Sequence, residues 1–383
     1  MGFTVAGVLL WAVYARREAK KLRSDPRLDL APALPLPEPR PVVSILIPAR
    51  NEAATLGPCL RSLLAQTVPA REILVVDDQS TDGTGAVAGA MAARHPQIRC
   101  LRVEELPEGW GGKNHALALG AAKASGEWLL FTDADTQHAP EALAQTLAYS
   151  CHQGLALCSL TGRQRCESFW EHAVQPVVYA FLDFRFSLKR IRDPACPDAA
   201  ANGQYLLVRR EAYERAGGHA ALRGDLLEDV ALARRAKALG YRIGLVRAPE
   251  LVATRMYTSL GGLWEGWTRN LLLLAGGRVG AAVEIAAWLL GLSVVPFVAG
   301  GTLLIGVGTG AAPPAAGVIA GLACAAILAQ EAGLRRLRGY APGWAVLQPL
   351  GALAVLAILV RSTWRGLLGL GVTWKGRAYS ARA

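Results

Sequence analysis

The chain has 383 residues, of which 19% are charged and 52% hydrophobic, and its net charge is +11. Soluble globular domains contain roughly 25% charged residues, so this composition argues against an entirely soluble protein. The seven cysteines form no C-x-x-C pair, which argues against a disulfide framework or a zinc site and favours a reducing compartment. Basic clusters beside apolar segments, without a nucleic-acid-binding motif, indicate a membrane rather than nucleic acid as the partner.

The N-terminal residues 1–24 combine a short apolar run, 3–14, with a basic flank that includes Arg16, Arg17 and Lys20. The run is short for a membrane span of about 20 residues. We interpret 1–24 as a short or incompletely represented membrane anchor whose C-terminal side faces the cytoplasm. Residues 25–41 contain six prolines and predict a linker.

Between residues 42 and 255, short β-type apolar runs alternate with patterns of helical spacing. This alternation predicts βαβ units and an α/β domain with a mostly parallel sheet. Ligands of such sheets bind beyond the carboxyl ends of the strands. Asp77, Asp78, Asp133 and Asp135 follow predicted strands, so we expect them to meet at one edge of the sheet.

In the stretch "VVDDQSTDGT", the second predicted strand ends in Asp77 and Asp78. Either carboxylate could accept hydrogen bonds from a base N–H or from ribose hydroxyls. Asp82 is predicted to cap the following helix instead. In "GWGGKNHAL", Lys113 lies at a helix start, where backbone N–H groups favour an anion such as a diphosphate. The alternative is a plain loop with a solvated lysine.

The stretch "FTDADT" places Asp133 and Asp135 two residues apart after an apolar run. In an extended chain, such residues point to the same side. Two adjacent carboxylates favour a hard divalent cation, Mg²⁺ or Mn²⁺, which also keeps places for substrate phosphates. The alternative is a polar turn that caps the next helix.

Glu228 and Asp229 fall in the first turn of a helix predicted from about Leu226 to the C-terminal glycine Gly240. Negative charges in the first turn interact favourably with the helix dipole, and this stabilisation is a purely structural explanation for the two acids. The functional alternative is a general base beside a cleft.

The C-terminal part is much more apolar. Residues 256–280 predict an amphipathic interfacial segment, with Trp264 and Trp267 at the membrane surface. Within 281–362, three nearly uncharged stretches, 281–308, 313–332 and 344–360, predict membrane spans, and 363–383 form a basic tail. An anchor plus three spans would put that tail on the far side from the α/β domain. Either one segment is therefore re-entrant, or 3–14 do not span.

The motifs "VSILIPARNE", "VVDDQSTDGT", "GGKNHAL", "FTDADT" and "LLEDVALARRAKALG" follow one another in an order that resembles family 2 glycosyltransferases of the GT-A fold. The apolar segments and the ending "VTWKGRAY" resemble the membrane-bound subgroup that includes hopanoid-associated and carotenoid glycosyltransferases. The processive synthases of the family carry Q-x-x-R-W, whereas this chain has "GWTRN", so the resemblance does not imply polymer synthesis.

The resemblance implies a role for each matching residue. Asp133 and Asp135 would hold the diphosphate through Mn²⁺ or Mg²⁺, and Lys113 would lie near it. Asp229, the second acid of the E-D pair with Glu228, would be the catalytic base. The remaining expected contacts are uridine for Ala49, Asn51, Glu52 and Asp78, and the diphosphate for Arg269.

The expected function is transfer of a sugar, with UDP-glucose as the donor implied by the resemblance, to a lipid hydroxyl of a hopanoid, carotenoid or glycerolipid. The expected location is the cell membrane, with a cytoplasmic catalytic domain. Two alternatives remain open at this point: a polyprenyl-phosphate sugar transferase, which needs no strong base, and a non-catalytic membrane scaffold. A Rossmann oxidoreductase is disfavoured because no G-x-G-x-x-G follows the first strand.

Overall fold

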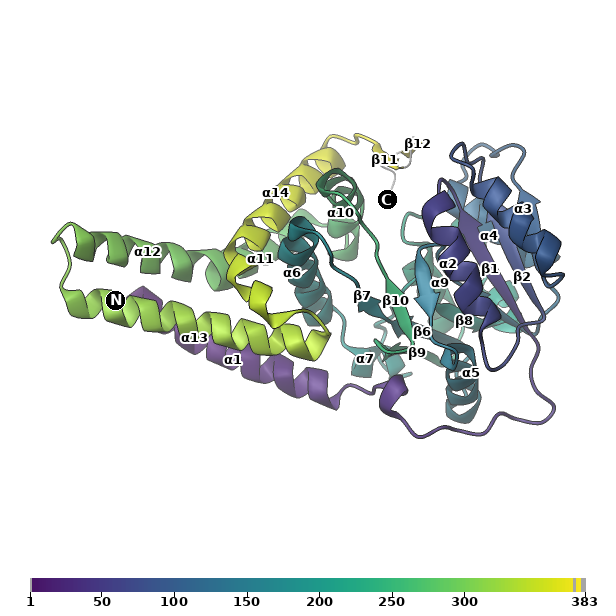
Figure 1. The fold of residues 1–383 in the computed structure, drawn as a ribbon, viewed down its shortest axis with the longest axis horizontal. Coiled ribbons are helices and arrows are strands. Elements are labelled where there is room, and N and C mark those ends of the chain that lie inside the picture. The colour runs from purple at the N-terminus through teal and green to yellow at the C-terminus, as the bar shows by residue number, and fades with distance from the viewer. Residues whose placement is uncertain (1, 375–376, 380–383) are drawn as a thin grey trace. The chain divides into compact units, whose positions relative to one another are not determined.

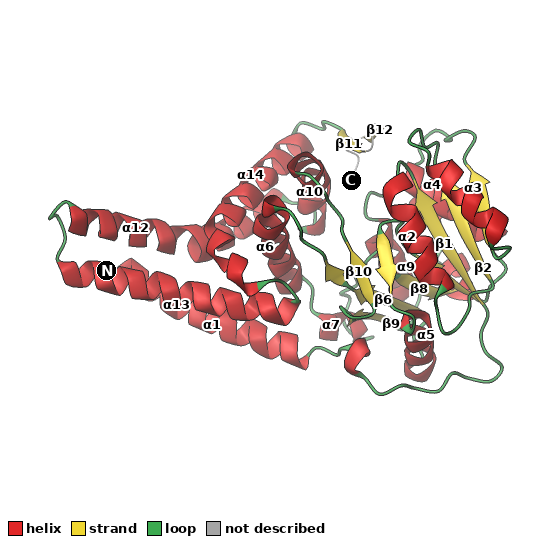
Figure 2. Ribbon diagram, viewed as in Figure 1, coloured by secondary structure: helices red, strands yellow, loops and turns green. Residues whose placement is uncertain are grey.

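The structure, a computed structural model, describes residues 2–374 and 377–379. The chain divides into two compact units, which are described separately (Figures 1 and 2). The α/β unit comprises Asp25–Arg165 and Phe186–Met256, and the helical unit comprises Met1–Ser24, Cys166–Arg185 and Tyr257–Ala383. The predicted continuous domain 42–255 is therefore interrupted, because residues 166–185 pack in the helical unit. The predicted linker 25–41 belongs to the α/β unit.

A seven-stranded sheet forms the centre of the α/β unit, in the order β3-β2-β1-β4-β8-β6-β9. Every pairing is parallel except the two made by β8, which runs antiparallel to β4 and β6. The predicted α/β class with a mostly parallel sheet is confirmed. The strands are β1 (Val43–Ala49), β2 (Glu72–Asp77), β3 (Ile98–Arg102), β4 (Trp128–Phe131), β6 (Leu157–Thr161), β8 (Leu206–Arg209) and β9 (Ile243–Arg247).

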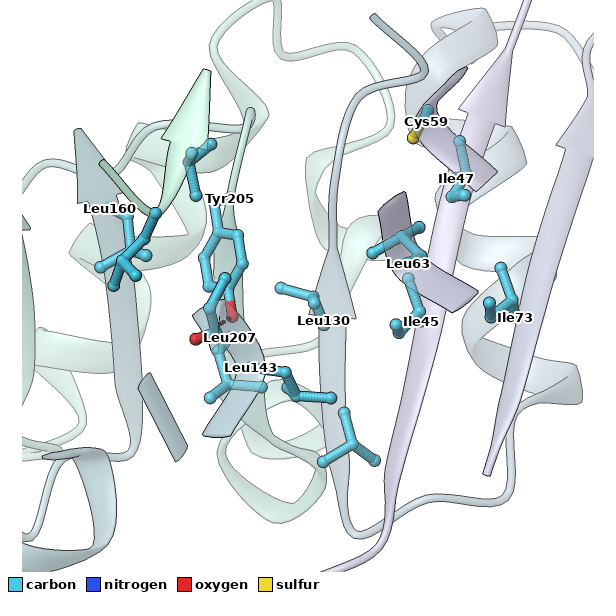
Figure 3. Close-up of a cluster of buried hydrophobic side chains, with 14 of the residues drawn as sticks. Ile45, Ile47, Cys59, Leu63, Ile73, Leu130, Leu143, Leu160, Tyr205 and Leu207 are labelled. Carbon is cyan, nitrogen blue, oxygen red and sulfur yellow. Dashed lines mark hydrogen bonds between the residues drawn. The ribbon is translucent and has the colours of Figure 1, made fainter. Parts of the chain in front are cut away.

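Both faces of the sheet are buried at β1, β2 and β4, which explains why these strands are almost continuously apolar, whereas the edge strand β3 is mostly exposed. Successive side chains of a strand point to opposite faces. Ile45 and Ile47 of β1 accordingly lie in one core, shown in Figure 3, whereas Leu46 lies in the other. The first core is covered by α2 (Ala53–Leu64), α3 (Thr84–Arg94) and α5 (Ala142–Gln153), and the second by α4 (Gly112–Lys123), α7 (Leu188–Arg192), α8 (Arg210–Arg215) and α9 (Glu228–Ala238).

A second, three-stranded sheet fixes the chain that follows β4. It has the order β5-β10-β7, with β5 (Thr136–His138) antiparallel to β10 (Val252–Thr254) and β7 (Arg163–Gln164) parallel to it. The short connection 132–135 therefore links one sheet to another, and both of its ends are held by strands.

The helical unit contains three stretches that are long and apolar enough to cross a membrane: Val279–Gly308, Pro314–Arg338 and Pro342–Leu367. They correspond to the three predicted spans. The unit consists of α1 (Gly2–Ser24), α6 (Phe169–Arg185), α10 (Leu260–Leu274), α11 (Val279–Leu289), the π-helix η3 (Leu290–Val294), α12 (Val295–Gly308), α13 (Pro314–Arg338), the 3₁₀ helix η4 (Pro342–Leu347), α14 (Gln348–Leu367) and a hairpin of β11 (Val372–Trp374) and β12 (Arg377–Tyr379).

The predicted N-terminal anchor is a helix, α1, that packs along α13. Trp11 and Leu22 of α1 are buried in a cluster with Ile327 and Leu334 of α13. Its role as an anchor remains a prediction, since among the described residues the three stretches above are those that meet the length and hydropathy of a span.

Trp267 of α10 packs inside the helical unit. Its side chain is only 2% exposed, and its Nε1 donates a hydrogen bond of 2.9 Å to Oε1 of Gln175 on α6. The rings of Tyr179 and Tyr257 pack edge-on against it. Trp267 therefore packs against α6, Trp264 is partly buried, and the interfacial position of the segment 256–280 stays a prediction.

A buried ion pair connects three helices of the same unit. Arg335 of α13 is fully buried, and its Nε donates to Oε1 of Glu331 at 2.8 Å. Its two terminal nitrogens donate to the carbonyl oxygen of His172 on α6 (3.0 Å) and to Oε1 of Gln348 on α14 (3.2 Å). Each of the three guanidinium nitrogens thus donates a hydrogen bond to a described residue, which is what a buried charge requires.

Candidate active site

The site lies at the edge of the sheet where three neighbouring strands end. Strands β2, β1 and β4 are adjacent and parallel, so their carboxyl ends share one edge, where ligands of such sheets bind. A small pocket opens there. It is lined by Pro48, Lys113, Leu117, Phe131, Thr132, Asp133, Gly203, Leu206, His219, Glu228 and Asp229. Four predicted site residues, Lys113, Asp133, Glu228 and Asp229, therefore meet in one place.

Lys113 is the cation at the centre of this pocket. It is the second residue of α4, and its Nζ lies 2.8 Å from Oδ1 of Asp133 and 2.7 Å from Oε1 of Glu228. The side chain is partly exposed, and both ion pairs hold the ammonium in the pocket. Asn114 fixes the start of α4 by donating to the carbonyl oxygens of Leu222 and Asp225, in the loop before α9.

The charge of Lys113 is stabilised by its surroundings. Burial lowers the pKa of the ammonium, but the negative charges of Asp133, Glu228 and Asp229 outweigh that effect and raise the pKa above its ordinary value. The lysine is therefore protonated at neutral pH. An anionic ligand that entered the pocket would meet this charge directly.

Asp229 has the properties of a general base. Its Oδ2 accepts a hydrogen bond of 2.7 Å from the backbone N–H of Gly203, and its Oδ1 accepts one of 2.7 Å from the N–H of Val230. Burial and the neighbouring charge of Glu228 raise the pKa of Asp229 to about 7, although Lys113 and the two N–H groups oppose the shift. A carboxylate with a pKa near neutrality can take up a proton and release it again under ordinary conditions.

Gly203 was not predicted from the sequence, yet the site depends on its lack of a side chain. A Cβ atom at this position would lie 3.1 Å from Nζ of Lys113, 3.4 Å from Oδ2 of Asp229 and 3.5 Å from Oε1 of Glu228. Its backbone N–H also holds Asp229 in place. The sequence signal was the glycine in "AANGQYLLV", three residues before β8. A glycine in or near a strand often marks a place where a ligand or another part of the chain comes close to the backbone.

His219 is a second residue that the sequence analysis missed. It belongs to the 3₁₀ helix η2 (His219–Leu222), is almost fully buried and lines the pocket. Its Nδ1 lies 2.9 Å from the hydroxyl of Tyr213, and its ring packs edge-on against Phe131. Burial and the nearby Lys113 lower the pKa of His219 to about 3, so the ring is neutral.

Asp133 and Asp135 lie in the turn that follows β4. Both side chains are partly exposed, whereas Thr132, Ala134 and Thr136 between and beside them are buried. The alternation predicted for D-x-D is therefore present, although the strand itself ends at Phe131. Within the described part of the chain, no group of three or more His, Cys, Asp or Glu side chains could hold a metal ion by itself.

The residues expected at the nucleoside belong to two loops that hydrogen-bond each other. Asn51 has a left-handed backbone (φ +53°), and its Oδ1 accepts a hydrogen bond of 2.9 Å from the N–H of Thr81. The backbone N–H of Glu52 donates to the hydroxyl of Thr84 at 2.8 Å, and that of Ala53 donates to Asp82 at 3.0 Å. Asp82 thus makes capping bonds.

The strand ends beside these loops carry the other predicted contacts. Ala49 is buried, and its carbonyl oxygen accepts a hydrogen bond of 2.8 Å from the N–H of Asp78. Oδ1 of Asp77 accepts one of 3.0 Å from the N–H of Ser80, so Asp77 shapes the loop. Arg269 belongs to the helical unit, on α10, where its Nε donates to Oδ1 of Asn270 at 2.8 Å. Its expected role at a diphosphate remains a prediction.

Comparison with known proteins finds a family resemblance that begins in the α/β unit. Residues 44–217 match the model of the family described as Glycosyl transferase family 2. The match covers a little less than half of the chain, and over this stretch the predicted resemblance is confirmed. The match ends before the E-D pair, Glu228 and Asp229.

Two curated relatives and two solved structures are also similar. The 4,4'-diaponeurosporenoate glycosyltransferases of Staphylococcus aureus strains USA300 and MRSA252 are 28% and 29% identical over 253 and 257 residues; each match covers 65% of this chain and 66% of the relative, just under two thirds. The mannosyltransferase PcManGT from Pyrobaculum calidifontis, in complex with GDP-Man and Mn²⁺, is 22% identical with a TM-score of 0.49, covering 96% of this chain and 97% of that one. Glucosyl-3-phosphoglycerate synthase from Mycobacterium tuberculosis, in complex with Mn²⁺ and UDP-glucose, is 23% identical with a TM-score of 0.42, covering 62% and 79%.

Proposed function

We propose that the protein is a membrane-bound, inverting glycosyltransferase that moves a sugar from a nucleotide-sugar, with a UDP-sugar as donor, to the hydroxyl of a lipid. The observation that carries this proposal is the pairing of Lys113 with Asp133 and Glu228, directly beside Asp229. One cation for a leaving diphosphate and one carboxylate with a pKa near 7 are the two groups that such a transfer needs.

Asp133 and Asp135 fit a divalent cation. Two partly exposed carboxylates on a single turn are too few to enclose an ion, but Mg²⁺ and Mn²⁺ are commonly bound by one or two carboxylates together with substrate phosphates. Such an ion, when bound, would neutralise negative charge on the diphosphate. Asp133 would then bind the ion through the carboxylate that Lys113 now pairs, leaving the ammonium available to the diphosphate.

Asp229 would act on the acceptor. The acceptor hydroxyl oxygen bonds to the anomeric carbon, the bond from that carbon to the diphosphate breaks, and the hydroxyl proton passes to Asp229. Displacement in line, from the side opposite the leaving group, inverts the anomeric configuration. The N–H groups of Gly203 and Val230 hold the carboxylate in one orientation, so less reorganisation is needed at the moment of transfer. Glu228 would position Lys113.

A lipid acceptor is supported by the helical unit. Three stretches there are long and apolar enough to cross a membrane, and the similar curated proteins are named 4,4'-diaponeurosporenoate glycosyltransferase. We propose a carotenoid, hopanoid or glycerolipid hydroxyl. The basic residues of α1, including Arg16, Arg17 and Lys20, support a cytoplasmic position for the neighbouring α/β unit in a multi-pass protein of the cell membrane.

The experiment that tests this function is donor turnover by the purified full-length protein in detergent. A panel of UDP-sugars is supplied with Mn²⁺, with Mg²⁺ or with a chelator, and Asp135→Ala serves as the site variant. Metal-dependent hydrolysis or transfer of one UDP-sugar, lost in Asp135→Ala, is expected. Equal turnover in the presence of the chelator would overturn the metal role, and no turnover of any UDP-sugar in the panel would overturn the proposed UDP-sugar transfer.

A further inference from the structure

The loop that carries Asp133 and Asp135 is closed by a buried histidine. His138, the last residue of β5, lies 3.0 Å through its Nε2 from the hydroxyl of Thr132, at the other end of the loop. Both residues are buried, at 6% and 1% exposure, whereas the two aspartates between them are partly exposed. The imidazole and the threonine therefore form a side-chain bridge across the base of the loop.

The same ring fastens the loop to a helix. Nδ1 of His138 lies 3.2 Å from the hydroxyl of Ser62 on α2, and the backbone N–H of His138 donates to that hydroxyl at 3.1 Å. Thr132 in turn donates to the carbonyl oxygen of Gln204 at 2.7 Å. Gln204 directly follows Gly203, whose N–H binds Asp229. The loop of the two aspartates and the residue that holds the base are thus connected through His138 and Thr132.

The network of His138, Thr132 and Ser62 has few protons that can be donated in hydrogen bonds. The hydroxyl of Ser62 lies 2.7 Å from the carbonyl oxygen of Cys59, just as that of Thr132 lies 2.7 Å from Gln204. Burial lowers the pKa of His138 to about 3, so the ring is neutral and carries one N–H. One ring nitrogen donates, and the other receives a proton from whichever hydroxyl turns toward it. An apolar ring would leave both hydroxyls without this partner.

We propose that His138 is a positioning residue: through Thr132 it sets the spacing and direction of Asp133 and Asp135, and hence the affinity of the site for a divalent cation bound with a nucleoside diphosphate. The inference rests on the proposed function, in which those aspartates bind that cation. Partners that orient metal ligands typically affect metal affinity by about 10–100-fold. A role in general stability alone would not change the metal requirement of the folded protein.

Variants at position 138 test the contacts of the two ring nitrogens separately. His138→Gln can place an amide nitrogen near the position of Nε2 and keep the Thr132 contact, whereas His138→Asn reaches only the position of Nδ1. Thr132→Val removes the hydroxyl that contacts His138 and leaves the shape of the side chain nearly unchanged. It tests the same contact if a His138 variant fails to fold. Thr146→Val is the matched control, since it removes an equally buried hydroxyl, bonded to Ala142 within α5.

The measurement is the Mn²⁺ concentration that gives half-maximal binding of UDP to the full-length protein in detergent, together with Tm in chelator. We expect Thr132→Val and His138→Asn to raise that concentration by about tenfold or more, and His138→Gln and Thr146→Val to stay near the wild type. An unchanged Mn²⁺ requirement in both Thr132→Val and His138→Asn, or a stronger effect of His138→Gln than of His138→Asn, would overturn the inference. If the wild type itself binds UDP without any metal dependence, it is the proposed metal site that fails.

Discussion

Lys113 and Glu228 come from the first turns of two different helices, and their charged atoms lie 2.7 Å apart in the pocket. Glu228 is the residue directly before Asp229. The same lysine therefore contacts the neighbour of the proposed base and, through Asp133, the loop of the proposed metal ligands. A change at any one of these side chains is therefore expected to affect the others.

Asp229→Asn should remove the proposed base. Loss of a general base typically lowers the rate by about 10²–10⁴-fold. Transfer to a lipid hydroxyl should fall by that factor, whereas UDP binding should persist, because the amide is nearly the same size. The measurement is single-turnover transfer alongside UDP affinity. Unaffected transfer would instead favour an acceptor phosphate, as in a polyprenyl-phosphate sugar transferase, which needs no base.

The pH dependence of transfer should follow the same carboxylate. The base must be deprotonated, and the pKa of Asp229 is raised to about 7, so kcat/KM should rise as the pH increases toward 7 and level off above it. Lys113 lowers this pKa and Glu228 raises it. Lys113→Met should therefore move the midpoint to higher pH, in addition to reducing the rate. A profile with its midpoint near pH 4, or a shift to lower pH in Lys113→Met, would contradict this assignment.

Gly203→Ala should damage activity more than stability. The new Cβ would lie 3.1 Å from Nζ of Lys113, and the flexible end of a lysine can move away at little cost. A displaced ammonium should lower turnover by about tenfold, since misplacement by 1 Å can cost about 100-fold. Gly89→Ala is the control, because nothing lies within 4 Å of a Cβ there. Turnover and Tm are measured for both; equal turnover would show that the site tolerates the methyl group.

Arg335→Met should destabilise the helical unit. Removing one partner of a buried ion pair typically costs about 3–5 kcal/mol, because the other charge stays buried. Adding Glu331→Gln should recover part of the loss, while the contacts to His172 and Gln348 remain missing. Thermal unfolding in detergent measures this, with the exposed Arg336→Met as the control. A double variant less stable than Arg335→Met alone would contradict the ion-pair explanation.

The sequence predicted the parts of the molecule that local pattern controls. The alternation of short apolar runs with segments of helical spacing predicted the mostly parallel sheet. The one-residue spacing of Asp133 and Asp135 predicted two acids on one side of the chain, and both are partly exposed while the residue between them is buried. The ion pair between Lys113 and Glu228 could not be predicted from the sequence, because Glu228 is distant in the chain and only the fold brings it near. The packing of Trp267 against α6 did not follow from the sequence, because composition alone cannot distinguish a helix that lies on lipid from one that packs on another helix.

The hydrogen bonds between the loops after β1 and β2 have a consequence for protein engineering. Asn51 binds Thr81, Glu52 binds Thr84 and Ala53 binds Asp82, so each loop supplies the polar partners that give the other its shape. A chimaera that borrows only one of the two segments from another enzyme would leave these partners mismatched. Residues 49–53 and 78–84 should therefore be exchanged together, as a single cassette, in a test of whether they are the proposed nucleoside contacts.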